Sequence, residues 1–214
     1  MAASRSGIWG WIRALFCLLL FFPVPGVGSQ EAAKQWLVDQ IHADGSLDSP
    51  ASKAITFQST TEATISLLDA DPGLLGALNG VVNYMAIVDA DRSTENLSRS
   101  IRTAYVLEQE FAQAQDQLLQ RQRVGSGFGA FPGYDPDPLS TAYALETLAL
   151  LGITQEPAAY ALQYLINAQN NDGSWALVDD VGQVQTTALA MHALWHYRHV
   201  YDVESSLQAA EDFL

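Results

Sequence analysis

Two pairs of aspartates are the most direct candidates for catalytic or metal-binding residues. Asp135 and Asp137 lie in the run Gly-Tyr-Asp-Pro-Asp-Pro at residues 133–138, and Asp179 and Asp180 are adjacent further along the chain. Paired carboxylates serve in glycoside hydrolysis, and carboxylate oxygens are preferred ligands of Ca²⁺. The alternative is structural, because an aspartate before a helix caps free amide groups and suits the helix dipole. We favour capping and keep the four aspartates as weaker catalytic candidates.

Three histidines have a spacing that could bind a metal. His192, His196 and His199 are separated as i, i+4 and i+7, so two imidazoles could reach one Zn²⁺, and a third if the helix end relaxes. No glutamate follows His192 in a His-Glu-x-x-His arrangement, and no acidic fourth ligand lies nearby in the sequence. The alternative is a place at the edge of the core for His192 and near a helix C-terminus for the other two. The sequence therefore predicts no cofactor. The weaker alternatives are Ca²⁺ at the aspartates and zinc at the histidines.

Aromatic side chains gather in the turns of the sequence. Tyr134 and Trp175, with Phe128 and Phe131, could line a pocket for an apolar or sugar ligand. The alternative, which we favour, is packing between neighbouring helical hairpins. Tyr134 and Trp175 are therefore kept as candidate ligand-binding residues.

The elements that must position these residues follow from an internal repeat. Residues 35–47 align without gaps with residues 163–175, and both segments end in Asp-Gly-Ser and a large apolar residue. A third, looser copy covers residues 117–122 and is followed by Gly129-Ala130-Phe131. We therefore align Gly45, Gly129 and Gly173, whose separations of 84 and 44 fit a period of about 42 to 44 residues with one blurred copy.

A second matching segment follows each copy, so that each repeat consists of two helices joined by a turn. Residues 157–169 are apolar on one face and predict a half-exposed outer helix. Residues 142–151 and 188–195 are apolar almost all round and predict buried inner helices. Residues 74–88 and 94–111 are also predicted to be helical.

The start of one inner helix is marked by Asp137 and Pro138, an N-cap followed by proline at the first helical position. No segment alternates convincingly with period two, so almost no sheet is expected. The predicted fold class is therefore all-α, an array of about four and a half helical hairpins.

One repeat resembles a known motif. Tyr164-Leu165, Gln169 and Gly173-Ser174-Trp175 have the spacing of the QW repeat of squalene and oxidosqualene cyclases. The helix-pair period resembles the wider α/α-toroid superfamily, which includes terpene cyclases, protein prenyltransferase β-subunits and the thioester domains of α-macroglobulins. The resemblance covers residues 30–214 and implies an α/α-toroid, here an incomplete ring. It gives a structural role to the glutamine, glycine and aromatic positions of the motif, which are Gln169, Gly173, Trp175, Gly45 and Gly129.

The catalytic groups of the resembling families can be checked residue by residue. Cyclase motifs place the proton-donating acid two residues before Thr-Ala, where this chain has Leu139 and Gln185. The prenyltransferase zinc site and the macroglobulin thioester each need a cysteine, and the one cysteine is Cys17. We therefore expect a non-catalytic binding or scaffold module. The alternative is a toroid-class enzyme, terpene cyclase-like or carbohydrate-active, with its catalytic residues in the acidic loops or beyond Leu214.

Residues 1–29 predict a secretory signal peptide. Arg5 and Arg13 flank apolar segments, and small residues precede an expected cleavage after Ser29. The apolar segment is shorter than the roughly 18 residues that a span needs, so we expect no membrane span after cleavage and a secreted or periplasmic protein. Cys17 lies within the signal, and residues 30–214 contain no cysteine.

The charge of the chain restricts its partners. Ten basic and twenty-four acidic residues give a formal charge of −14. Loss of Arg5 and Arg13 with the signal changes this to −16. Such a charge argues against nucleic acid, because phosphate binding depends on Lys and Arg. Residues 204–214 predict the outer helix of a fifth hairpin, so we expect the domain to continue beyond the chain end, with other domains of a longer exported polypeptide as candidate partners.

Overall fold

The computed structural model describes residues 30–47, 53–88, 92–177 and 181–214. These residues form helices and no β-strand, which confirms the all-α prediction. The described residues divide into two compact units between Asp39 and Gln40, and α2 (Gln30–Asp39) belongs to the first. The second contains α3 (Lys53–Ala70), the 3₁₀-helix η1 (Pro72–Leu78), α4 (Asn79–Ile87), α5 (Thr94–Val106), α6 (Ala112–Leu119), α7 (Pro138–Leu150), α8 (Ala158–Asn167), α9 (Val184–Tyr197) and α10 (Glu204–Phe213). Over the described part of the chain, no helix combines the length and apolarity needed to cross a membrane.

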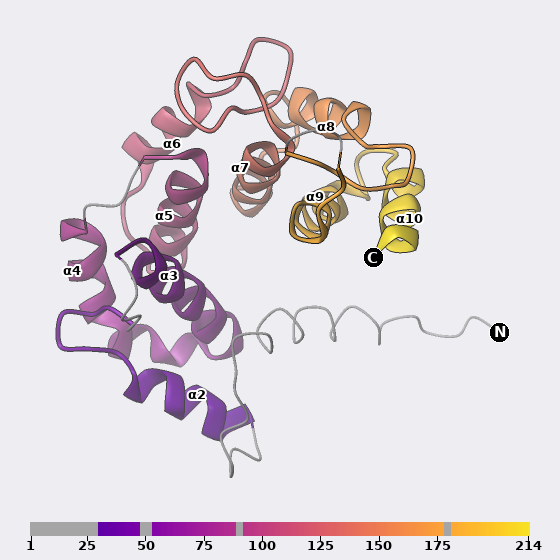
Figure 1. Cartoon of the computed structure of the whole chain (residues 1–214). Helices are drawn as coiled ribbons and strands as arrows, with labels where there is room; N and C mark the ends of the chain where they lie inside the picture. The colour runs from indigo at the N-terminus through magenta and orange to yellow at the C-terminus, as the bar shows by residue number, and fades with distance from the viewer. Residues whose placement is uncertain (1–29, 48–52, 89–91, 178–180) are drawn as a thin grey trace. The chain divides into compact units, whose positions relative to one another are not determined.

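Four helices of the second unit pack in sequence order. Helix α3 contacts α5, α5 contacts α7 and α7 contacts α9 (Figure 1), and we call these four the central helices. Each also packs against one further helix: η1 against α3, α6 against α5, α8 against α7 and α10 against α9. Helix α7 has neighbours on three sides and buries ten of its thirteen residues. A helix enclosed in this way needs apolar residues nearly all round, which explains the composition of residues 142–151.

The starts of two central helices are fixed by side-chain caps. Asp137 Oδ1 accepts a hydrogen bond from Ser140 N at 2.7 Å, and Pro138 is the first helical residue, as the sequence predicts. Ser93 caps α5 through the amide of Asn96. Helix α5 ends at Val106 rather than at the predicted residue 111, because the chain turns at Glu108, where φ is 56°.

Turns with the same hydrogen-bond pattern precede α3, α7 and α9. In each case the residue after the turn is a large apolar residue, and its amide donates to a threonine hydroxyl of the central helix. The three bonds are Leu47 N to Thr60 Oγ1 at 2.8 Å, Phe128 N to Thr141 Oγ1 at 3.0 Å, and Trp175 N to Thr187 Oγ1 at 3.0 Å. All three apolar side chains are buried. The three copies of the sequence repeat therefore share one local structure.

The sequence alignment of the middle copy is wrong by three residues. Within the turns, Gly45 N donates to His42 O, Ser126 N to Arg123 O, and Gly173 N to Asn170 O. Ser126, and not Gly129, is therefore the equivalent of Gly45 and Gly173. Gly129 lies against α5 instead, where its carbonyl accepts from Thr94 Oγ1 at 2.6 Å.

The motif glutamine connects one hairpin to the next. Gln169 Nε2 donates to Gly173 O within its own turn and to Ser206 O in α10, both at 2.9 Å. Gln122 makes the same pair of bonds, to Ser126 O at 3.0 Å and to Pro157 O at 2.8 Å. Gly173 has φ +87°, and an added Cβ would lie 2.0 Å from a backbone oxygen of α10, so only glycine fits there.

Candidate functional site

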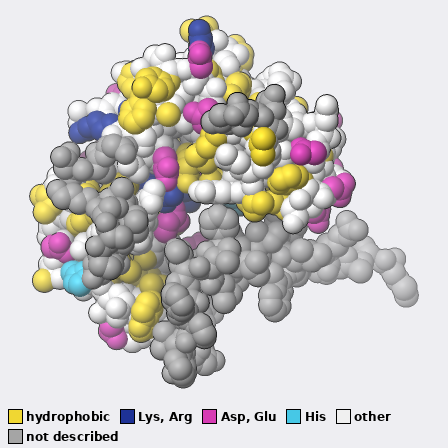
Figure 2. All heavy atoms as spheres, viewed as in Figure 1, with side chains coloured by type: hydrophobic (Ala, Val, Ile, Leu, Met, Phe, Trp, Pro, Cys, Tyr) yellow, Lys and Arg dark blue, Asp and Glu magenta, His cyan; other side chains and the backbone are white. Residues whose placement is uncertain are grey.

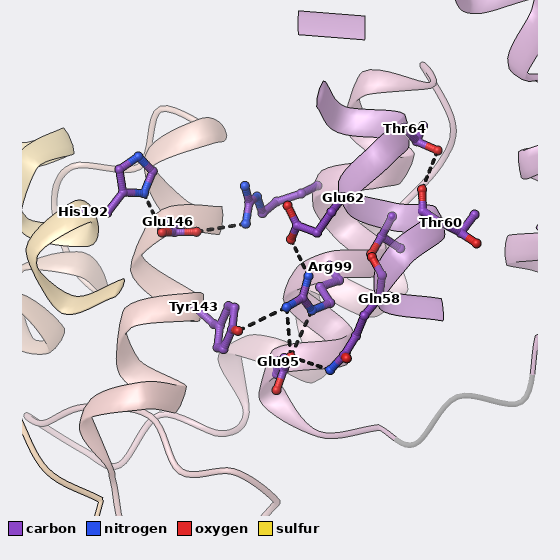
Figure 3. A network of polar contacts seen from close by, with 11 residues as sticks. Gln58, Thr60, Glu62, Thr64, Glu95, Arg99, Tyr143, Glu146 and His192 are labelled. Carbon is purple, nitrogen blue, oxygen red and sulfur yellow. Dashed lines mark hydrogen bonds and ion pairs between the residues drawn. The ribbon is translucent and has the colours of Figure 1, made fainter. Parts of the chain in front are cut away.

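The central helices carry polar side chains that meet at equivalent positions of the repeat. Partners on α3 and α5 are 37 residues apart, partners on α5 and α7 are 44 apart, and those on α7 and α9 are 46 apart. These spacings approximate one repeat, so residues at the same level of successive helices face each other. Figure 3 shows the resulting network, which extends from Gln58 on α3 to His192 on α9.

Arg99 of α5 is the centre of the first part of this network. It is 8% exposed and forms ion pairs with Glu62 and with Glu95, the latter at 3.0 Å from both Nε and Nη2. Its Nη2 also donates to Tyr143 OH at 3.1 Å, and its guanidinium lies 5.3 Å from the centre of the Tyr143 ring. Burial opposes the charged guanidinium, but the carboxylates of Glu62 and Glu95 outweigh burial and raise the pKa of Arg99. Arg99 therefore holds three central helices together.

Tyr143 keeps its proton at neutral pH. Its side chain belongs to α7 and is 3% exposed, and burial raises the pKa of Tyr143 to about 12 despite the nearby Arg99 charge. The phenol therefore has a hydrogen to donate while its oxygen accepts from Arg99.

Glu146 of α7 is the centre of the second part. Its Oε2 accepts from Arg102 Nη1 of α5 at 2.8 Å, and its Oε1 lies 2.6 Å from Nδ1 of His192 on α9. Burial acts to raise the pKa of Glu146, but the hydrogen bond with His192 and the charge of Arg102 outweigh it and hold that pKa below its ordinary value. This carboxylate therefore links α5, α7 and α9 in its charged form.

A pocket of about 340 Å³ opens beside the first part of the network, at the N-terminal ends of α5 and α7. Its polar lining comes from Ser93 and Glu95 of the α5 end and from Asp137, Ser140 and Tyr143 of the α7 end. Its apolar lining consists of Ala130, Leu139 and Leu177. In Figure 2, acidic and basic side chains lie together in the hollow between α5 and α7.

Several polar groups of this pocket have a donor or acceptor atom that no described residue uses. All the bonds to Glu95, from Gln58 and Arg99, fall on Oε1, and no described residue donates to Oε2. Asp137 uses Oδ1 to cap α7. Ser140 is 7% exposed, and no described group pairs with its hydroxyl. The pocket thus offers carboxylate oxygens as acceptors and hydroxyl groups as donors.

The predicted aspartates separate in the structure. Asp137 is both a cap and a lining residue of the pocket. Asp135 is 84% exposed in its side chain and pairs with Arg123. Asp179 and Asp180 lie outside the described residues.

The two candidate aromatic residues also have different surroundings. Tyr134 is 63% exposed, and its ring meets the edge of Phe131 at a centroid distance of 5.5 Å. Trp175 is fully buried and donates from Nε1 to Leu165 O at 2.8 Å, which leaves no exposed face for a ligand.

The three predicted histidines lie in different surroundings. His192 faces Glu146, and the His196 ring packs edge-on against His192 with centroids 4.6 Å apart. His199 is exposed in the turn that follows α9. Among the residues that the structure describes, no three His, Cys, Asp or Glu side chains gather as a metal site would require.

Sequence reasoning missed the charged and phenolic members of the network, which are Glu62, Glu95, Arg99, Arg102, Tyr143 and Glu146. A signal for them was present, because partners on neighbouring helices differ by about one repeat. Searching the helices for polar residues at that separation would have found them.

No protein-family model and no curated protein matches this chain.

Proposed function

We propose that residues 30–214 belong to an exported α/α-toroid domain, similar to the repeats of squalene cyclases and prenyltransferases, that binds a small ligand without transforming it. The pairing of each central helix with one outer element supports this architecture, because toroids are built from such pairs. The shared turn of the three copies and the bridging glutamines support it further.

The observation that carries the binding role is the pocket at the ends of α5 and α7. It combines an apolar wall with a few convergent polar groups, which is the usual composition of a small-molecule site. Its floor is held in place by Arg99, whose three partners fix the positions of Glu95 and Tyr143 before any ligand arrives. A site arranged in advance in this way loses less conformational freedom when a ligand binds.

Filling the pocket tests this proposal. Leu139 lines it and belongs to neither part of the polar network, so Leu139→Trp should block the pocket and leave the network intact. Ligand-observed NMR would screen the full chain against a library of sugars, amines and carboxylic acids. We expect ligands that bind the native chain and not Leu139→Trp, while Val124→Trp, a change at a fully exposed position, retains binding. Ligands that bind both variants equally, or a library without ligands, would contradict the proposal.

One observation favours a second candidate, an enzyme of the toroid class. Glu95 occupies on α5 the repeat position that Leu139 holds on α7 and Gln185 on α9, where cyclase motifs carry their acid. Against this role, Glu95 Oε1 accepts three hydrogen bonds from Gln58 and Arg99, which engages the group as an acceptor. Incubation with squalene or oxidosqualene distinguishes the enzyme from the binding module. A cyclised product that the native chain forms and Glu95→Gln does not form would favour the enzyme.

Export rests on the predicted signal at residues 1–29 and has its own test. Expression in a bacterium, followed by N-terminal sequencing of the protein recovered outside the cytoplasm, should give a chain that begins at Gln30. Recovery of the intact N-terminus in the cytoplasm would contradict it.

A further inference from the structure

We propose that the ligand of the pocket at the ends of α5 and α7 is a neutral saccharide unit, an inference that rests on the binding role proposed above. Two independent features of the pocket lead to this chemistry: the sign of its charge, and the mixture of hydrogen-bond donors and acceptors that its walls leave unused.

The charge of the site disfavours anionic ligands. Glu62, Glu95 and Asp137 carry three carboxylates at or beneath the pocket, and Arg99 supplies one guanidinium among them. Glu95 and Asp137 line the pocket itself, and with Glu62 and Arg99 included the net charge of these four groups is −2. A phosphate or carboxylate would therefore meet repulsion from its surroundings.

The hydroxyls of the pocket disfavour a simple cation. Ser140 lines the pocket, is more than nine-tenths buried, and has a hydroxyl that no described residue pairs with. Tyr143 accepts from Arg99 and retains its own hydrogen, for which no described residue is the acceptor. A hydroxyl hydrogen on the pocket wall can be paired by a ligand that brings an acceptor, and an ammonium ion has none to offer.

A polyhydroxylated ligand satisfies all of these groups together. Each of its hydroxyls can donate to a carboxylate oxygen, such as Glu95 Oε2, and accept from a hydroxyl, such as that of Ser140 or Tyr143. The C–H face of a sugar ring is apolar and suits the wall formed by Leu139 and Leu177. A volume of about 340 Å³ is near the lower end for small-molecule sites, which fits a monosaccharide or disaccharide unit.

Isothermal titration and saturation-transfer NMR on the full chain test this inference. The probes are glucose, galactose, mannose, N-acetylglucosamine, maltose and lactose, with butylammonium and acetate as the competing chemistries. We expect at least one sugar to bind and neither ion to compete with it. Ser140→Ala should weaken the sugar by about three- to tenfold, the effect of one lost hydrogen bond. Ser205→Ala, a matched change at an exposed serine of α10, should leave binding unchanged. Thermal unfolding of both variants controls for folding.

The outcomes separate this inference from the binding role itself. Binding of butylammonium or acetate that Leu139→Trp blocks, with no sugar bound, would overturn the saccharide and retain the pocket as a binding site. A sugar that binds Ser140→Ala as tightly as the native chain would also overturn the saccharide assignment at this pocket. No binding by any probe or library compound would overturn both proposals.

Discussion

Replacing Glu146 by glutamine tests whether the polar network stabilises the central helices. Glu146 has a side chain that is 5% exposed and connects Arg102 of α5 to His192 of α9. Glutamine has nearly the same shape and keeps one acceptor oxygen, but it removes the negative charge. The change therefore leaves the Arg102 guanidinium, whose side chain is 16% exposed, without its counter-charge.

The expected loss of stability follows from this burial. Removing one partner of a buried ion pair costs about 3–5 kcal/mol, because the other charge stays buried and unpaired. Arg102 keeps some contact with water and glutamine keeps one hydrogen bond, so we expect the lower limit, about 3 kcal/mol. For a chain of this size, 1 kcal/mol corresponds to about 2–4 °C in melting temperature, so the expected shift is about 6–12 °C.

The pH dependence of this loss has a definite sign. The pKa of Glu146 is lowered in the folded chain, so its stabilising effect is complete above the ordinary glutamate pKa of 4.5. Below that pH the unfolded chain takes up the proton first, and the effect is lost as the pH falls through the folded pKa. The stability difference between the native chain and Glu146→Gln should therefore be full at pH 6 and close steadily below pH 4.5.

Urea and thermal unfolding, followed by circular dichroism from pH 6 to pH 3, measure both quantities. Glu211→Gln is the matched control, because it removes an exposed carboxylate of α10 and should cost less than about 0.5 kcal/mol. The double variant Arg102→Met with Glu146→Leu should recover most of the loss, since no unpaired charge remains. A cost for Glu146→Gln no larger than that of the control, or a difference that persists to pH 3, would refute the reasoning.

Three further changes test the turns between helices. Gly173→Ala should lower the free energy of unfolding by about 3 kcal/mol or more, because the residue has positive φ and an added Cβ would overlap α10. Gly125→Ala should cost only about 1 kcal/mol, because Gly125 has φ +66° but open space around it. Thermal unfolding of the two variants compares these costs. Gln169→Ala should cost about 2 kcal/mol by removing two hydrogen bonds, one within its own turn and one to α10, measured by urea unfolding. Thr187→Val should cost about 1–3 kcal/mol by leaving the buried Trp175 amide unpaired, and tryptophan fluorescence would follow the unfolding. Equal costs at the two glycines, or no cost at the other two positions, would contradict these assignments.

The helices were largely predictable because their periodicity is strong. The predicted outer helix at residues 157–169 corresponds to α8 (Ala158–Asn167), and the inner helix at residues 188–195 lies within α9 (Val184–Tyr197). Helix propensity and apolar pattern agree in these segments, so local sequence suffices. The end of α5 was not predictable in this way, since it depends on one backbone angle at Glu108 rather than on composition.

The register of the middle repeat was missed for a specific reason. Residues 125–133 contain four glycines, and matching by residue type selected Gly129. The structure requires instead that the residue after the turn place its amide against the threonine hydroxyl of the next helix, which Phe128 does with Thr141. A contact between segments thirteen residues apart therefore defines the repeat better than the glycine does.

The candidate site was only partly predictable. Asp137 was identified from its place before a proline, and its capping bond has the expected geometry. Glu95 and Ser140 were not identified as site residues, because neither belongs to a catalytic or ligand-binding motif. Their proximity depends on how the ends of α5 and α7 are offset along their axes, and such an offset is set by packing rather than by either helix alone.

The repeat explains how one pocket arises among similar helices. Glu95, Leu139 and Gln185 occupy one repeat position on three successive central helices, yet they are acidic, apolar and amide side chains. At the next level along the helices, Arg99 and Tyr143 likewise differ in type while they face each other. Identical side chains at these positions would place like charges, or apolar groups alone, against one another. Divergence between repeats therefore creates both the ion pairs that join the helices and, at the ends of α5 and α7, a pocket where carboxylates, hydroxyls and apolar side chains converge.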